Sequence, residues 1–159
     1  AGLFEAMEAG AAFGNVDQIA RAIEVKIRVV EADPFEKGER ATLNLGHTIG
    51  HGVEAASGYK LRHGEAVAIG LAAESQLAEG LGLAESGLAQ RIARACTQVG
   101  LPVNCPSLNP VRIREAMSSD KKKAGGRLKF ALPKRIGEVT WGVEADEDLL
   151  LEVLKSAAS

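Results

Sequence analysis

The sequence is poor in aromatic residues and in long hydrophobic runs, and it has no excess of charge of one sign. Only 4% of its 159 residues are Phe, Trp or Tyr, so the core must be built from Ala, Leu, Ile and Val, which suits closely packed helices. No apolar run approaches the roughly 20 residues of a membrane-spanning helix, and no signal peptide is recognisable. A net charge of −2 gives no indication of a nucleic-acid or anionic-membrane partner.

Cysteine is scarce as well. Cys96 and Cys105 form neither a metal-ligand spacing nor a disulfide framework, so we interpret both as buried or incidental thiols and expect a cytoplasmic protein. The length suits one domain, residues 1–159, with its own core. The chain begins at Ala1 without an initiator Met, inside a predicted helix, which suggests a domain cut from a longer protein.

Apolar spacing predicts helices along most of the chain. In the first long helix, apolar residues recur on one face, and Asn15 with Gln18 forms an N-terminal capping box. Residues 64–80 are apolar nearly all round, which predicts a central, buried helix. The predicted helices are 3–9, 16–32, 38–57, 64–80, 84–99, 110–118 and 147–157.

Two short segments near the C-terminus have the composition of strands. Residues 128–132 and 138–143 alternate or are rich in β-formers, and Gly137 lies between them. We therefore predict one β-hairpin. The predicted fold is mainly α, a helical bundle with one small β-hairpin.

A polar stripe marks the helix predicted over 38–57. Arg40, Asn44, His47 and His51 are spaced i, i+4, i+7 and i+11, within a sector roughly 60° wide on one helix face. Buried polar groups cost free energy unless each finds a partner, so the stripe suggests a ligand site. A solvent-facing stripe is the alternative, but Gly46 and Gly50 would weaken an exposed helix by about 1 kcal/mol each; glycines suit close approach of a backbone or ligand.

All three histidines of the chain lie between residues 47 and 63. His47 and His63 lie on two predicted helices that a short loop joins. If these helices are antiparallel, the two histidines can point to one place, and neutral imidazole is a common zinc ligand. A catalytic zinc needs three protein ligands and an open position. Glu54 and Glu65 are the nearby carboxylates, and spacing alone does not assign either. Hydrogen-bonded core or surface histidines are the alternative.

Several cations are candidates for binding an anionic group. Lys26 flanks the first long helix, and Lys121 and Lys122 follow Asp120 in a charged loop. With Arg40 they offer a set that can hold a phosphate or carboxylate. The alternatives are a lysine extended to solvent and a solvated charge run.

At this level the sequence resembles a known family. Residues 43–51 (LNLGHTIGH) and 63–68 (HGEAVA) are similar to the core signature of 3-dehydroquinate synthases, and the loop at 120–122 and Ile136-Gly137 also match. The resemblance implies the metal- and substrate-binding C-terminal part of a lyase of the shikimate pathway, which makes aromatic amino acids. That family converts 3-deoxy-arabino-heptulosonate 7-phosphate to 3-dehydroquinate and phosphate with bound NAD and zinc or another divalent metal such as cobalt.

The resemblance also implies roles for individual residues. His47 and His63 would be metal ligands, and His51 an acid/base near the phosphate. Glu36 would orient Arg40. The substrate would be bound by Lys26, Arg40, Asn44, His51 and either Lys121 or Lys122.

The family's remaining parts lie upstream of residue 1. They are the third metal ligand, a glutamate, and the NAD-binding α/β domain, which would be this chain's partner within the same enzyme. We therefore expect this chain alone to be inactive and to bind metal weakly. The resemblance further implies a homodimer.

Three other functions stay open from the sequence. The first is another sugar-phosphate cyclase, such as an inosose or valiolone synthase. The second is a metal-dependent alcohol dehydrogenase, whose substrates would give the loop at 120–122 no purpose. The third is a non-enzymatic helical regulatory or assembly domain.

Overall fold

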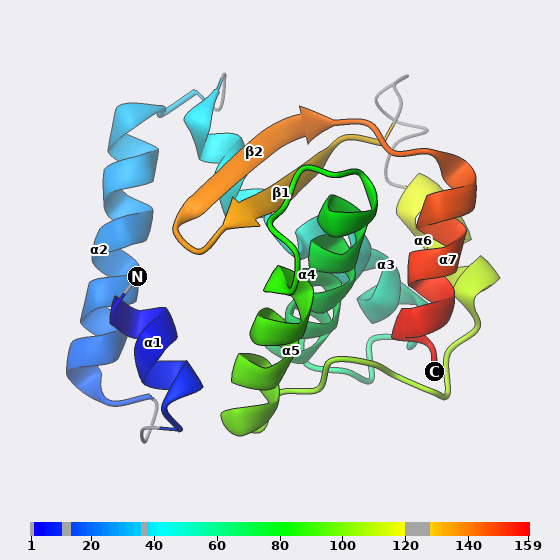
Figure 1. Cartoon of the computed structure of the whole chain (residues 1–159), viewed down its shortest axis with the longest axis horizontal. Coiled ribbons are helices and arrows are strands. Elements are labelled where there is room, and N and C mark those ends of the chain that lie inside the picture. The colour runs from blue at the N-terminus through cyan, green and yellow to red at the C-terminus, as the bar shows by residue number, and fades with distance from the viewer. Residues whose placement is uncertain (1, 11–13, 36–37, 120–127) are drawn as a thin grey trace.

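The computed structural model describes residues 2–10, 14–35, 38–119 and 128–159. Within them the chain forms a bundle of helices with a β-hairpin lying across one end (Figure 1). This confirms the predicted mainly α fold. In chain order the elements are α1 (Gly2–Glu8), α2 (Val16–Ala32), the 3₁₀ helix η1 (Glu39–Asn44), α3 (His47–Ala56), α4 (His63–Gly80), α5 (Leu88–Gln98), α6 (Pro110–Ser119), β1 (Phe130–Arg135), β2 (Glu138–Val143) and α7 (Glu147–Ala157).

Helix α4 forms the centre of the bundle, as its apolar sequence predicts. It packs against α3, α5 and α7 and against β1, and most of its side chains are buried. The main core joins Ile69 and Leu77 of α4 to side chains of α3, α6, β1 and α7. Since an all-apolar helix gains most by burial on every side, the other helices surround it. None of the helices in the described segments is long and apolar enough to cross a membrane.

Glycines allow α3 and α4 to pack backbone against backbone. A Cβ on Gly70 of α4 would lie 2.1 Å from the carbonyl oxygen of Gly46 and 2.6 Å from the backbone nitrogen of Gly50. Gly50 in turn faces the backbone of Ala66 and Val67. The glycines of the 43–51 motif therefore serve close approach of another backbone, one of the two explanations that the sequence suggested.

The segment 38–57 is not one continuous helix, and this prediction was wrong. A 3₁₀ helix, η1, ends at Asn44, Leu45 is extended, and Gly46 adopts the left-handed conformation with φ 79° before α3 begins at His47. Glycine takes this conformation at little cost. The break lets α3 start against α4, and it removes the regular stripe that the sequence predicted from Arg40 to His51.

The hairpin forms where it was expected, with β1 starting two residues later than predicted. Its strands pair antiparallel, from Phe130 with Val143 to Arg135 with Glu138, and Gly137 takes a positive φ of 84° in the turn. The first four residues of β1 are buried, because the strand packs on α4 and η1 as well as on β2. Residues 128 and 129 precede the strand.

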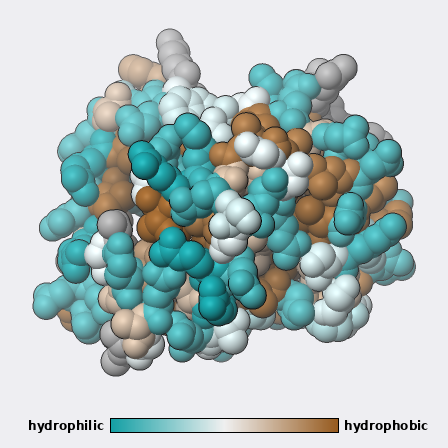
Figure 2. Space-filling model, viewed as in Figure 1, coloured by the Kyte–Doolittle hydropathy of each residue, from teal (hydrophilic) through white to brown (hydrophobic). Residues whose placement is uncertain are grey.

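Helix α2 stands at the side of the bundle. The predicted capping box is present, since Gln18 donates its backbone N–H to Asn15 and its side chain accepts from the backbone of Asn15. Its principal packing partner is η1, and no side chain of α2 is buried. Ile19 and Ile23 keep 50% and 51% of their surface exposed, and Figure 2 shows hydrophobic surface along the inner edge of this region.

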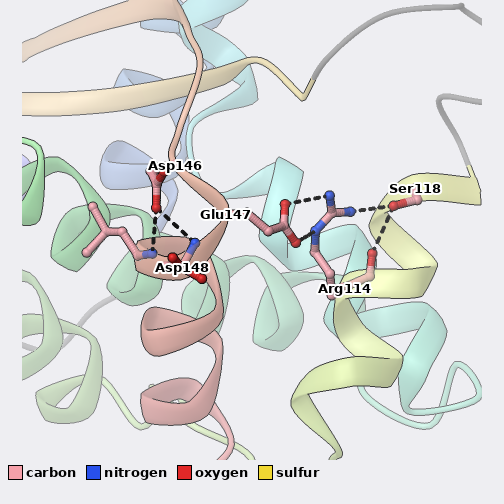
Figure 3. A network of polar contacts seen from close by, with 6 residues as sticks. Arg114, Ser118, Asp146, Glu147 and Asp148 are labelled. Carbon is pink, nitrogen blue, oxygen red and sulfur yellow. Dashed lines mark hydrogen bonds and ion pairs between the residues drawn. The ribbon is translucent and has the colours of Figure 1, made fainter.

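The C-terminal helix is fixed at its first turn. Asp146 accepts hydrogen bonds from the backbone N–H groups of Asp148 and Leu149, which caps α7 as predicted. Next to it, Arg114 of α6 donates two hydrogen bonds to Glu147, at 2.7 and 2.9 Å, and a third to Ser118 (Figure 3). This bidentate contact joins α6 to α7 and holds the pKa of Glu147 below its ordinary value.

Candidate functional site

The three histidines converge although they come from two helices. His47 and His51 lie in the first two turns of α3, and His63 is the first residue of α4. The ring centroids are 5.5 Å apart for His47 and His51, 5.4 Å for His47 and His63, and 5.7 Å for His51 and His63. We call these three residues the histidine cluster. The packing of α3 on α4 thus brings the imidazole of α4 next to the two imidazoles of α3.

Two of the rings are oriented through their Nδ1 atoms. Nδ1 of His47 lies 3.1 Å from the carbonyl oxygen of Leu45, and Nδ1 of His63 lies 3.3 Å from Oε2 of Glu54. A carbonyl oxygen and a carboxylate only accept, so both Nδ1 atoms carry the proton. In the neutral form of each ring the Nε2 atom then has the lone pair, which is the tautomer that metal-binding histidines need.

His47 is held in its neutral form. Partial burial lowers its pKa, and the nearby His51, His63 and Lys26 lower it further, against the opposing hydrogen bond to Leu45. A neutral imidazole is required for metal binding. The electrostatic contribution of Lys26, the smallest of these, indicates that the positive charge on α2 acts on His47.

A cavity of about 470 Å³ opens beside the histidine cluster. His47 and His51 form part of its wall, together with Asn44 from η1 and Lys129 from the segment before β1. The hydroxyl of Thr48 lies 3.5 Å from the carbonyl oxygen of Lys129, which places that segment next to α3. The cavity is lined by Asn44, His47, Thr48, His51, Glu54, Ala55, Tyr59, Ala116, Met117, Leu128 and Lys129.

The other predicted site residues lie in different places. Arg40 does not line this cavity, because its guanidinium donates to the carbonyl oxygen of Pro34 at 3.0 Å. Lys26 borders a shallow, mostly apolar hollow on α2, with Ile19 and Ile23. Glu36, Lys121 and Lys122 fall outside the described residues.

Two residues near the cluster have roles that sequence reasoning did not give them. Lys129 was interpreted only as part of a strand, and its place in the cavity wall depends on the contact of the segment before β1 with Thr48 of α3. Glu54 was considered as a possible ligand, whereas its contact with His63 makes it an orienting carboxylate. Its position seven residues after His47, on the same helix face, was the available signal.

The nitrogen donors fit a divalent metal of the zinc type. Imidazole nitrogens of this kind are ligands that zinc and cobalt accept. Within the described parts of the chain, however, no three His, Cys, Asp or Glu side chains form a complete metal-binding group.

Comparison with known proteins decides the family. Residues 5–123 match the family of 3-dehydroquinate synthase C-terminal domains. The chain belongs to this family. It is 42% identical over 138 residues to a 3-dehydroquinate synthase of Caldanaerobacter subterraneus subsp. tengcongensis, covering 86% of the chain and 38% of that enzyme. It is 43% identical over 138 residues to that of Pyrococcus abyssi, covering 87% and 40%.

Solved structures share the fold of this 3-dehydroquinate synthase domain. One is 2-epi-5-epi-valiolone synthase from Streptomyces hygroscopicus subsp. jinggangensis with NAD⁺ and Zn²⁺, with a TM-score of 0.80, 24% identity and coverage of 99% of this chain and 46% of that one. Another is 2-deoxy-scyllo-inosose synthase with carbaglucose-6-phosphate, NAD⁺ and Co²⁺, with a TM-score of 0.78, 23% identity and coverage of 88% and 41%. The chain spans about two fifths of the length of the 3-dehydroquinate synthases that it matches.

Proposed function

We propose that this domain is the metal- and substrate-binding part of a 3-dehydroquinate synthase, which converts 3-deoxy-arabino-heptulosonate 7-phosphate to 3-dehydroquinate and phosphate in the shikimate pathway. The enzyme is then a phosphorus–oxygen lyase. The observation that supports this most directly is the histidine cluster beside a polar cavity, in a chain of this family. Both cysteines are free thiols, which fits the cytoplasmic location that we propose.

His47 and His63 hold the metal through their Nε2 atoms in this proposal. Leu45 and Glu54 fix the ring orientations from the Nδ1 side, which raises the basicity of the ligands. A divalent zinc or cobalt ion, when bound, supplies Lewis acidity toward a substrate hydroxyl or carbonyl oxygen. His51, the third ring, serves as a hydrogen-bonding acid and base toward the substrate, and it is not a ligand.

The substrate occupies the cavity beside the cluster. Asn44 and Lys129 line it and offer an amide and an ammonium group to hydroxyl, carboxylate or phosphate oxygens. Lys26 acts from α2, on the side where it already influences His47. Arg40 takes part only if its guanidinium leaves the carbonyl oxygen of Pro34. Glu36 as the residue that orients Arg40, and Lys121 or Lys122 as substrate-binding residues, stay predictions.

We also propose that an N-terminal NAD-binding domain of the same enzyme covers the apolar face of α2. Ile19 and Ile23 are half exposed there, and the 3-dehydroquinate synthases that this chain matches are a little more than twice as long as the chain itself. That domain would supply the NAD site and the third metal ligand, so the isolated chain should not turn over the substrate. Homodimerisation belongs to the same proposal.

Cobalt binding to the isolated chain tests the metal ligands. Co²⁺ bound to histidine nitrogens gives visible absorption that can be titrated, and His47→Ala and His63→Ala should each lower the affinity at least about tenfold. His51→Ala is the matched control, because it removes the third ring and should leave the Co²⁺ affinity within about threefold of wild type. Equal losses in all three variants would contradict the assignment of His51.

Activity of the full-length enzyme tests the substrate. The enzyme should release phosphate from 3-deoxy-arabino-heptulosonate 7-phosphate and be far slower with heptulose phosphates, which lack the carboxylate. His51→Ala should abolish most of this turnover while the metal stays bound. Preference for a heptulose phosphate would replace the proposed reaction by that of another sugar-phosphate cyclase.

A further inference from the structure

Glu74 is an acidic residue buried in the centre of the bundle. It lies in α4 with 0% of its surface exposed, among alanines and other apolar residues. Its two carboxyl oxygens face α3: Oε2 accepts from the backbone N–H of Gly46 at 2.5 Å, and Oε1 accepts from that of Ile49 at 3.0 Å. The backbone of Thr48 lies close enough to lower the pKa of this carboxyl group slightly.

Helix α3 needs these acceptors because its own sequence provides none. The first backbone N–H groups of a helix have no partner within the helix, and the residue before a helix usually accepts from them with its side chain. At α3 that residue is Gly46, which has no side chain. Glu74 takes over the capping from a neighbouring helix.

The capped turn is the one that carries His47. This residue lies between Gly46 and Ile49, both of which donate to Glu74, and His51 follows one turn later. Because η1 ends at Asn44 and Leu45 is extended, no preceding helix fixes the direction of α3. We propose that Glu74 is the positioning residue of the histidine cluster, which holds the first turn of α3 so that His47 and His51 face His63. This inference rests on the proposed metal-binding function.

Packing alone does not explain an acidic residue at this place. Burial raises the pKa of Glu74 to about 8, against the opposing effect of the three backbone N–H groups, and an apolar side chain would avoid the cost of burying a carboxyl group. What an apolar residue cannot supply is two acceptor oxygens for separate N–H groups. Glutamine cannot supply them either, since its amide nitrogen would face one N–H donor with another.

The same helix offers a matched control. Glu79 lies five residues after Glu74 in α4 and accepts from the backbone N–H of Ala89 at 2.9 Å, in the first turn of α5. Helix α5 carries none of the proposed site residues. Glu79→Gln therefore makes the same chemical change to a capping carboxylate of α4, away from the histidine cluster.

The experiment compares Glu74→Gln with Glu79→Gln in the isolated chain. Co²⁺ titration followed by visible absorption should show affinity lowered at least about tenfold by Glu74→Gln and changed less than about threefold by Glu79→Gln. In metal-free samples, NMR should show faster amide exchange at Gly46 and Ile49, and loss of the NOE between the rings of His47 and His63, only in Glu74→Gln.

The NMR arm separates this inference from the proposed function. If the wild-type chain binds no Co²⁺, the proposal that His47 and His63 bind metal without the N-terminal domain fails, and the ring NOE and amide exchange still decide the role of Glu74. Should Glu74→Gln fail to fold, Glu74→Asp is measured instead, because it keeps both oxygens but withdraws them from α3 by one methylene. Unchanged Co²⁺ affinity together with an intact His47–His63 NOE in the folded variant would overturn the inference.

Discussion

Replacing Gly70 by alanine should separate α3 from α4 and lower the stability of the domain. The new Cβ would stand 2.1 Å from the carbonyl oxygen of Gly46, and contacts under 3.0 Å are essentially never found, so α3 must move by about 0.9 Å. The atoms in the way belong to backbone and cannot rotate aside. Overpacking of this kind costs about 3 kcal/mol of stability. The better helix propensity of alanine offsets only about 1 kcal/mol of that loss.

Gly64→Ala is the matched control on the same helix. No atom lies within 4 Å of a Cβ at that position, so this variant should keep the wild-type stability or gain up to about 1 kcal/mol. The free energies of unfolding of the two variants should therefore differ by roughly 3 kcal/mol in urea titrations followed by circular dichroism. A difference below about 1 kcal/mol would refute the idea that the two backbones are in contact.

Three further predictions follow from individual charges. The folded-state pKa of Glu74, about 8, exceeds its ordinary value of 4.5, so its contribution to stability is complete below pH 4.5 and is lost as the pH rises through 8. In urea titrations between about pH 5.5 and pH 9, the free energy of unfolding of wild type should fall by about 3 kcal/mol more than that of Glu74→Gln. Equal losses in the two proteins would contradict this. The pKa of Glu147 is lowered, mainly by the hydrogen bond from Arg114, so Glu147→Gln should cost less than about 1 kcal/mol at neutral pH, because the pair is largely exposed. Urea titration should show this difference vanish as the pH falls from the ordinary value of 4.5 through the lowered pKa of Glu147. A difference that persists in acid would assign it to packing. Lys129→Ala in the full-length enzyme should raise KM for the phosphorylated substrate about tenfold without changing Co²⁺ affinity. The control variant Lys134→Ala, in the hairpin, should leave KM unchanged. Equal effects of the two variants in steady-state kinetics would remove Lys129 from the site.

The sequence predicted the helices well where their signals are local. The capping box at Asn15 and the apolar composition of α4 depend on residues a few positions apart, and both appear in the structure. The break before α3 was not predicted, because the spacing of polar and apolar residues in this segment also fits one continuous helix. Only the close contact with Gly70 of α4, a tertiary interaction, shows why Gly46 leaves the helical conformation.

The candidate site was predictable to a similar extent. The proximity of His47 and His63 followed from two adjoining antiparallel helices, and the structure shows it. Arg40 was grouped with them by helical spacing, which fails once η1 and α3 are separate elements. Lys129 and Glu74 reach the site from segments distant in sequence, and no spacing rule links residues that are brought together only by the packing of a strand or a helix.

The contact between the main chains of α3 and α4 has a consequence for how this domain tolerates sequence change. Distances between the imidazoles are set by peptide groups that touch each other, and the bulky side chains of the core do not define them. Enlarging or trimming an aliphatic residue such as Leu77 or Leu154 can thus weaken the whole bundle while leaving the spacing of the rings intact. Thermal robustness and metal-site geometry are therefore able to vary independently among related sequences, provided that the three glycines are kept.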